Sequence, residues 1–128
     1  MLKRYLILIA SALVGCDESK VIVPGERIGK YVLGAKSVDY SDDEILVFTD
    51  PYGVINHVAV RSPEYTLAGR QVIGSNIEPL MRQFSDLKSS QPHYDKFGYH
   101  FYCSASQGVG FSMAEGQVSS VHVFAATQ

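Results

Sequence analysis

The side chains best suited to chemistry form an acidic cluster in the first half of the chain. It combines carboxylates with two interleaved tyrosines: Asp39, Tyr40, Asp42, Asp43, Glu44, Asp50 and Tyr52. Carboxylate oxygens could bind calcium, but the spacing departs from the EF-hand loop, which also needs a glycine at its sixth position. The cluster could instead attract a basic protein partner, with the tyrosines supplying buried contact area. The third interpretation is a solvated acidic loop.

The other chemistry-bearing residues do not combine into a catalytic or metal centre. The histidines are widely spaced, and no His-x-x-x-His or Cys-x-x-Cys pair gives local metal-ligand spacing: His57, His93, His100 and His122. The segment around Ser112 lacks the second glycine of the Gly-x-Ser-x-Gly nucleophile motif. His57 and His122 lie beside valines on expected strands, where hydrogen-bonded structural histidines are the expectation. We therefore expect neither an enzyme nor a cofactor.

The N-terminus has the pattern of a secretory signal peptide. Lys3 and Arg4 give it a basic start, and the apolar run over 5–14 is shorter than the ~20 helical residues that a membrane span needs. The run ends in Leu13-Val14-Gly15-Cys16, which resembles the lipobox of bacterial lipoproteins. The resemblance implies cleavage between Gly15 and Cys16 and a membrane anchor of acyl chains on Cys16. The alternative is an ordinary signal peptide that happens to contain a cysteine.

The expected organisation is a signal peptide over 1–15, a lipidated N-terminus and tether over 16–24, and a single domain over 25–126. Cleavage would remove two positive charges from a chain whose formal net charge is −2. A mildly acidic protein without a basic run is not expected to bind nucleic acid. Asp17 resembles the residue that retains enterobacterial lipoproteins at the inner membrane. The expected location is therefore the periplasmic side of the envelope, at the inner or the outer membrane, with Asp17 favouring the inner.

Cys103 is left without an intramolecular partner if Cys16 carries lipid. It lies in an alternating run in which it shares a face with Tyr99 and Phe101, whereas His100 points to the opposite face. We therefore expect a buried strand thiol that behaves as a small hydrophobic group. A nucleophile and an intermolecular disulfide are the alternatives.

Alternating apolar residues and turn residues predict a sheet-rich domain with one helix. The expected strands are 28–33, 45–49, 54–62, 65–67, 99–104, 108–113 and 118–124. One apolar stripe at helical spacing predicts a helix that begins near Asn76 and ends before Ser89: Ile77, Leu80, Met81, Phe84 and Leu87. The predicted fold is α+β, with an antiparallel sheet of four to six strands covered by this amphipathic helix in a two-layer sandwich.

A weak internal repeat relates two of the expected strands. Residues 53–60 and 116–123 share the pattern Gly-x-aliphatic-x-x-Val-x-Val, for which chance similarity is the alternative explanation. The lead-in Ile73-Gly74-Ser75, the helix and the final strands together resemble small envelope lipoproteins of the outer-membrane-assembly type and the β-lactamase-inhibitor-type fold, over about residues 69–125. Members of these groups act by protein–protein binding, as scaffolds or enzyme inhibitors, and the resemblance is one of fold.

These features predict a lipid-anchored, non-enzymatic bacterial envelope protein that binds another protein. It would act as an assembly scaffold or as an inhibitor or immunity protein, and the acidic, tyrosine-bearing cluster is the expected contact surface. The alternative is a small-ligand or cation-binding periplasmic domain that uses the acidic loop 39–50.

Overall fold

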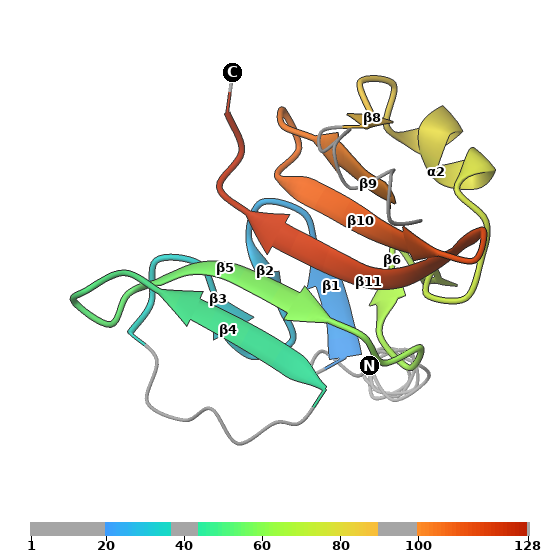
Figure 1. Cartoon of the computed structure of the whole chain (residues 1–128). Coiled ribbons are helices and arrows are strands. Elements are labelled where there is room, and N and C mark those ends of the chain that lie inside the picture. Colours follow the sequence, from blue (N-terminus) through green and yellow to red (C-terminus); the bar gives the residue numbers. More distant parts are fainter. Residues whose placement is uncertain (1–19, 37–43, 90–99, 128) are drawn as a thin grey trace, which may run out of the picture.

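Two β-sheets make up the part of the chain that the computed structural model describes, which is residues 20–36, 44–89 and 100–127 (Figure 1). The larger sheet is antiparallel and has six strands in the spatial order β4 (Ile45–Thr49), β5 (Ile55–Val60), β11 (Gln117–Phe124), β10 (Val109–Ala114), β9 (His100–Ser104) and β8 (Lys88–Ser89). The smaller sheet has five short strands in the order β3 (Tyr31–Val32), β2 (Arg27–Ile28), β1 (Val21–Val23), β6 (Thr66–Leu67) and β7 (Arg70–Gln71).

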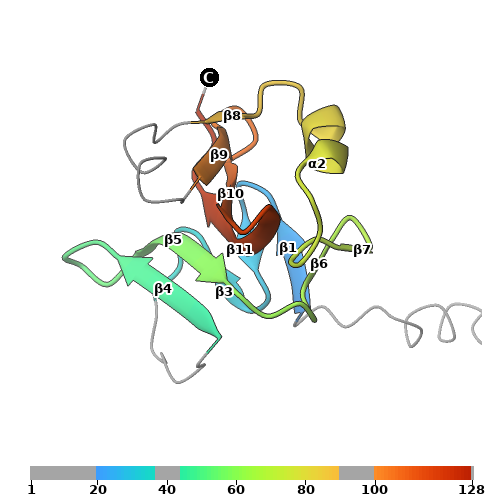
Figure 2. The same ribbon diagram turned by 45° about the vertical axis from the view of Figure 1, so that its right-hand side comes forward.

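The sequence correctly predicts most of the larger sheet. β4 and β5 form the expected hairpin around the turn at 50–53 (Figure 2), and β9, β10 and β11 form the expected C-terminal meander. Both features are local, because each strand pairs with the next one along the chain and a turn segment separates them. The prediction of a sheet-rich domain is therefore confirmed.

The prediction that an amphipathic helix covers this sheet is wrong. The helix α2 spans only Glu78–Gln83, fewer than two turns at about 3.6 residues per turn. It ends because the backbone of Phe84 is extended, with φ −114° and ψ 97°. Leu80, Phe84 and Leu87 are buried, but Met81 is 46 % exposed. In Figure 1, α2 lies beyond the end of the larger sheet that carries β8.

The smaller sheet packs against the larger one instead. The segment 28–33, expected to form one strand, makes a tight turn between β2 and β3, where Gly29 has a positive φ of 58°. β1 lies within the segment expected to be a tether, and it pairs antiparallel with β2 and parallel with β6. The ordered domain thus begins before residue 25. Such two- and three-residue strands leave too little alternation in the sequence to be recognised.

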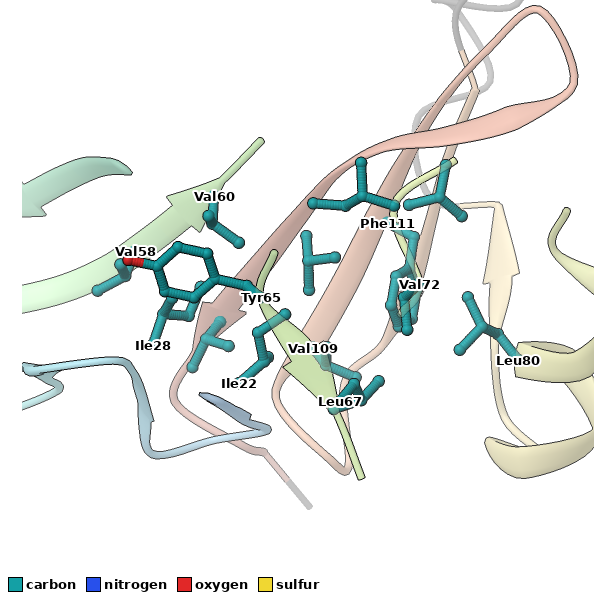
Figure 3. Packing of buried hydrophobic residues seen from close by; sticks show 14 of the residues in the cluster. Ile22, Ile28, Val58, Val60, Tyr65, Leu67, Val72, Leu80, Val109 and Phe111 are labelled. Carbon is teal, nitrogen blue, oxygen red and sulfur yellow. The ribbon is translucent and has the colours of Figure 1, made fainter. Parts of the chain in front are cut away.

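The hydrophobic core lies between the two sheets (Figure 3). The smaller sheet contributes Ile22, Ile28 and Leu67, each no more than 2 % exposed. The larger sheet contributes the side chains on its inner face, all of them fully or almost fully buried: Val58, Val60, Val109, Phe111, Val118, Val121 and Val123. Each buried aliphatic side chain stabilises the fold by about 1.5–3 kcal/mol relative to an exposed one. This core holds the outer face of the larger sheet in place.

The internal repeat has a structural counterpart. β5 and β11 are adjacent and antiparallel, with Val58 opposite Val123 and Val60 opposite Val121. The sequence pattern matches Val58 with Val121 and Val60 with Val123, so a local twofold relation exchanges the two strands. The repeated pattern therefore coincides with a symmetric pairing of β5 and β11.

The backbone hydrogen bonds made by the segments before β5 and β11 follow the same twofold relation. Gly34 N–H donates to Ile55 O, and Gly74 N–H donates to Val118 O, both at 2.8 Å. In return, Ile55 N–H donates to Ala35 O at 2.9 Å and Val118 N–H donates to Ser75 O at 2.8 Å. The segments that lead into β5 and β11 are therefore hydrogen-bonded to these strands in the same way.

Candidate functional site

The β4–β5 hairpin carries those members of the predicted acidic cluster that the structure describes. Glu44 precedes β4, Asp50 follows it, and Tyr52 lies in the turn. The remaining predicted site residues lie outside the described ranges: Gly15, Cys16, Asp39, Tyr40, Asp42 and Asp43.

Asp50 has a structural role in this turn. Its Oδ1 accepts hydrogen bonds from Tyr52 N–H at 2.8 Å and from Val54 N–H at 3.0 Å. An aspartate that accepts from amides two and four residues ahead stabilises the turn conformation. Tyr52 is left 80 % exposed at the tip of the hairpin. One carboxylate oxygen of Asp50 is therefore used by the turn, and Asp39, Asp42 and Asp43, on which the cation-binding alternative also rests, lie outside the described residues.

Two further exposed residues on this hairpin were missed by sequence reasoning. Leu46 is 55 % exposed and Phe48 is 46 % exposed, whereas Ile45 is buried and Val47 packs against the core. The sequence feature that contains both residues is the uninterrupted apolar run 45–48. Such a run is typical of a strand covered on both faces. Here one face is uncovered, so alternate apolar side chains reach solvent. We define Leu46, Phe48 and Tyr52 as the hairpin surface.

Phe48 lies against a pair of histidines on the outer face of the larger sheet. The centroids of the Phe48 and His57 rings are 4.7 Å apart, and the rings are stacked. His57 Nε2 lies 3.0 Å from His122 Nδ1. Phe101 packs edge-on against His122, with ring centroids 5.2 Å apart. The two histidines are 65 residues apart in the sequence, and they meet because β5 and β11 are adjacent.

The second ring nitrogen of His122 contacts two hydroxyl groups. His122 Nε2 is 2.9 Å from Ser120 Oγ and 3.1 Å from Ser112 Oγ. Both nitrogens of His122 therefore have polar partners, which agrees with the expectation of a hydrogen-bonded strand histidine. The spacing of these residues in the sequence gave no indication that they would form one cluster.

Burial keeps this histidine pair neutral. Desolvation, followed by the nearby His57, lowers the pKa of His122 to about 4, and desolvation also lowers the pKa of His57. A serine beside a histidine is the arrangement of a nucleophile and its base. However, a base with a pKa of about 4 is poorly matched to neutral pH. We interpret the cluster as a neutral network that holds His57 against Phe48.

Cys103 and Asp86 also have structural interpretations. Burial, and then the charge of Asp86, raises the pKa of the half-buried Cys103 thiol, which makes it a poor nucleophile. Asp86 accepts hydrogen bonds from the hydroxyls of Ser104 and Ser106, both at 2.6 Å, and these bonds lower its pKa. They tie the segment after α2 to the β9–β10 turn. Among residues 20–36, 44–89 and 100–127, no group of three or more metal-binding side chains occurs.

No family model, curated protein or solved structure matches this chain. In the part of the chain that the structure describes, no helix is both long and apolar enough to cross a membrane. The hairpin surface, backed by the histidine pair, is the feature that best fits a binding role.

Proposed function

We propose that this protein is a lipid-anchored bacterial envelope protein that binds another protein through the hairpin surface and catalyses no reaction. The observation that carries this proposal is the exposure of Leu46, Phe48 and Tyr52, between 46 % and 80 %, on a single edge hairpin. Contiguous exposed apolar side chains mark interaction sites, and aromatic residues contribute strongly to binding energy. Glu44 and Asp50 add negative charge at the two ends of the strand, which favours encounter with a basic partner.

Phe48 is suited to binding because neighbouring side chains hold its ring in place. Its ring stacks on His57, which in turn contacts His122. A side chain that is held in place before binding loses less conformational entropy when a partner covers it. The histidine network therefore contributes to affinity indirectly, by positioning Phe48.

Site-specific photocross-linking tests the location of the contact. With a photoreactive phenylalanine analogue at Leu46, we expect a discrete cross-linked product with one partner in intact bacterial envelopes. The same analogue at Met81, which is 46 % exposed on α2, is the matched control and should give no such product. Identical products from the two positions would contradict the assignment of the surface.

Substitution of Phe48 by alanine should weaken binding of the partner identified in this way. We expect a loss of about 2 kcal/mol, or roughly thirtyfold in Kd, because the contact of a supported aromatic ring is removed. Met81→Ala should change Kd by less than about twofold, as is typical of residues outside a contact. Titration calorimetry with both variants measures the difference, and equal effects would argue against the hairpin surface.

The anchor part of the proposal is supported by Leu13-Val14-Gly15-Cys16, which resembles the lipobox. We expect Cys16→Ser to move the protein from the membrane fraction to the soluble fraction and to abolish labelling with radioactive palmitate. Cys103→Ser, the matched control, should leave both unchanged. Palmitate labelling that persisted in Cys16→Ser would rule out the predicted acylation site.

A further inference from the structure

Within the described residues, β4 presents an edge that no other strand pairs with, as well as exposed side chains. It is the outermost strand of the larger sheet, and within the described residues only β5 pairs with it (Figure 1). Arg61 N–H donates to Glu44 O at 3.1 Å, and Asp50 N–H donates to Val54 O at 2.9 Å. The even-numbered residues of this segment thus direct their backbone groups toward β5. Because alternate residues of a strand point to opposite sides, the backbone groups of Ile45, Val47 and Thr49 point away from the sheet.

These outward backbone groups define what can bind. A row of unpaired N–H and C=O groups is a template for another strand, and recognition by strand addition takes side-chain specificity from alternate positions. We propose that β4 accepts an extended segment of the partner protein as an additional antiparallel strand. The segment carries apolar side chains beside Leu46 and Phe48, and lysine or arginine beside Glu44 and Asp50. This inference rests on the proposed function and specifies the chemistry of the partner.

Charge explains why the partner is not a second copy of this chain. Antiparallel pairing of two β4 strands centred on Val47 would bring Leu46 opposite Phe48, which is favourable. However, it would also bring Glu44 opposite Asp50 at both ends of the strand. Like charges directly opposite each other destabilise strand pairing, and charged residues on an edge strand limit self-association. A segment with basic ends keeps the apolar contacts and replaces the repulsion with attraction.

A designed peptide tests this mode of binding without knowledge of the natural partner. The probe is acetyl-Lys-Thr-Leu-Thr-Phe-Thr-Lys-amide, added to the purified, ¹⁵N-labelled full chain. We expect it to shift the amide signals of β4 and to slow hydrogen exchange at Ile45, Val47 and Thr49. The matched control peptide has glutamate at both ends and should bind at least about tenfold more weakly.

A second pair of peptides separates backbone pairing from side-chain contact. N-methylation at the second, fourth and sixth residues removes the N–H groups that would face β4, and it should abolish binding. N-methylation at the third and fifth residues removes N–H groups that face solvent, and binding should persist. Equal loss in both peptides would overturn the strand-addition model.

The remaining outcomes distinguish this inference from the proposed function. If the basic peptide leaves the amides of β4 unchanged while cross-linking at Leu46 still captures a partner, strand addition is wrong and the binding function stands. If the glutamate peptide binds equally well, the charge selection is wrong. If these amide signals change with protein concentration in the absence of peptide, the occupant is a second copy and the proposal is overturned.

Discussion

Replacement of Gly108 by alanine is expected to destabilise the protein by about 3 kcal/mol or more, the combined cost of a left-handed backbone and a steric clash. Gly108 has a φ of 72°, and a Cβ atom there would lie 2.3 Å from Phe124 O and 2.8 Å from Gly25 Cα. Its carbonyl oxygen accepts hydrogen bonds from Gly25 N–H and Phe124 N–H, both at 3.1 Å. The residue thus joins the segment after β1 to the end of β11, where an added methyl group has no room.

Gly53→Ala is the matched control for this prediction. Gly53 also has a positive φ, 82°, but no atom lies within 4 Å of the position that its Cβ would occupy. The Gly53→Ala substitution should therefore lower the free energy of unfolding only by the cost of a left-handed backbone at alanine, about 1 kcal/mol. Urea unfolding followed by circular dichroism gives both free energies of unfolding. If the two variants had the same free energy of unfolding, close packing around Gly108 would not be the cause of the destabilisation by Gly108→Ala.

Acid is expected to weaken the fold through His122. Its pKa is about 4 in the folded protein and 6.5 in the unfolded reference. Between these values the unfolded chain binds more protons, so the contribution of neutral His122 is fully present above pH 6.5 and is lost as the pH falls to 4. The difference corresponds to about 2–3 kcal/mol, after allowance for the partial exposure of the ring. Burial lowers the pKa of His57 in the same direction.

The measurement is the free energy of unfolding as a function of pH. His122→Gln should flatten the slope between pH 6.5 and 4, because glutamine does not titrate but can hydrogen-bond. His100→Gln, at an exposed position on β9, controls for loss of a histidine elsewhere. If the His122→Gln slope equalled that of the unmodified protein, burial of the imidazole would not be the source of the acid sensitivity.

Local patterns predicted the elements that depend on neighbouring residues. The turn at Asp50-Pro51-Tyr52-Gly53 and the alternation on either side of it were enough to place the β4–β5 hairpin. The apolar stripe around α2 correctly predicted burial of Leu80, Phe84 and Leu87, but it did not predict a long helix. Apolar spacing reports which side chains are buried, and a loop can bury Leu87 as well as a helix can.

The features that could not be predicted depend on contacts between distant segments. β1 and β6 pair across more than forty residues, and two-residue strands such as β6 have no periodicity of their own. The contact between His57 and His122 required knowledge of which strands are neighbours. The exposure of Leu46 and Phe48 likewise depends on whether another layer covers β4, which the composition of the strand does not reveal.

Strand pairing between the first and second halves of the domain has a consequence for how the chain folds. β5 of the first half pairs with β11 of the second, and β1 of the first half pairs with β6 of the second. The larger sheet cannot complete its hydrogen bonding until residues 117–124 are available, and such long-range pairing makes folding slow because loop entropy is lost before contacts form. The larger sheet and the core that it shares with the smaller sheet should therefore stay incomplete until β11 has been synthesised. This delay suits a protein whose N-terminus has the pattern of a secretion signal.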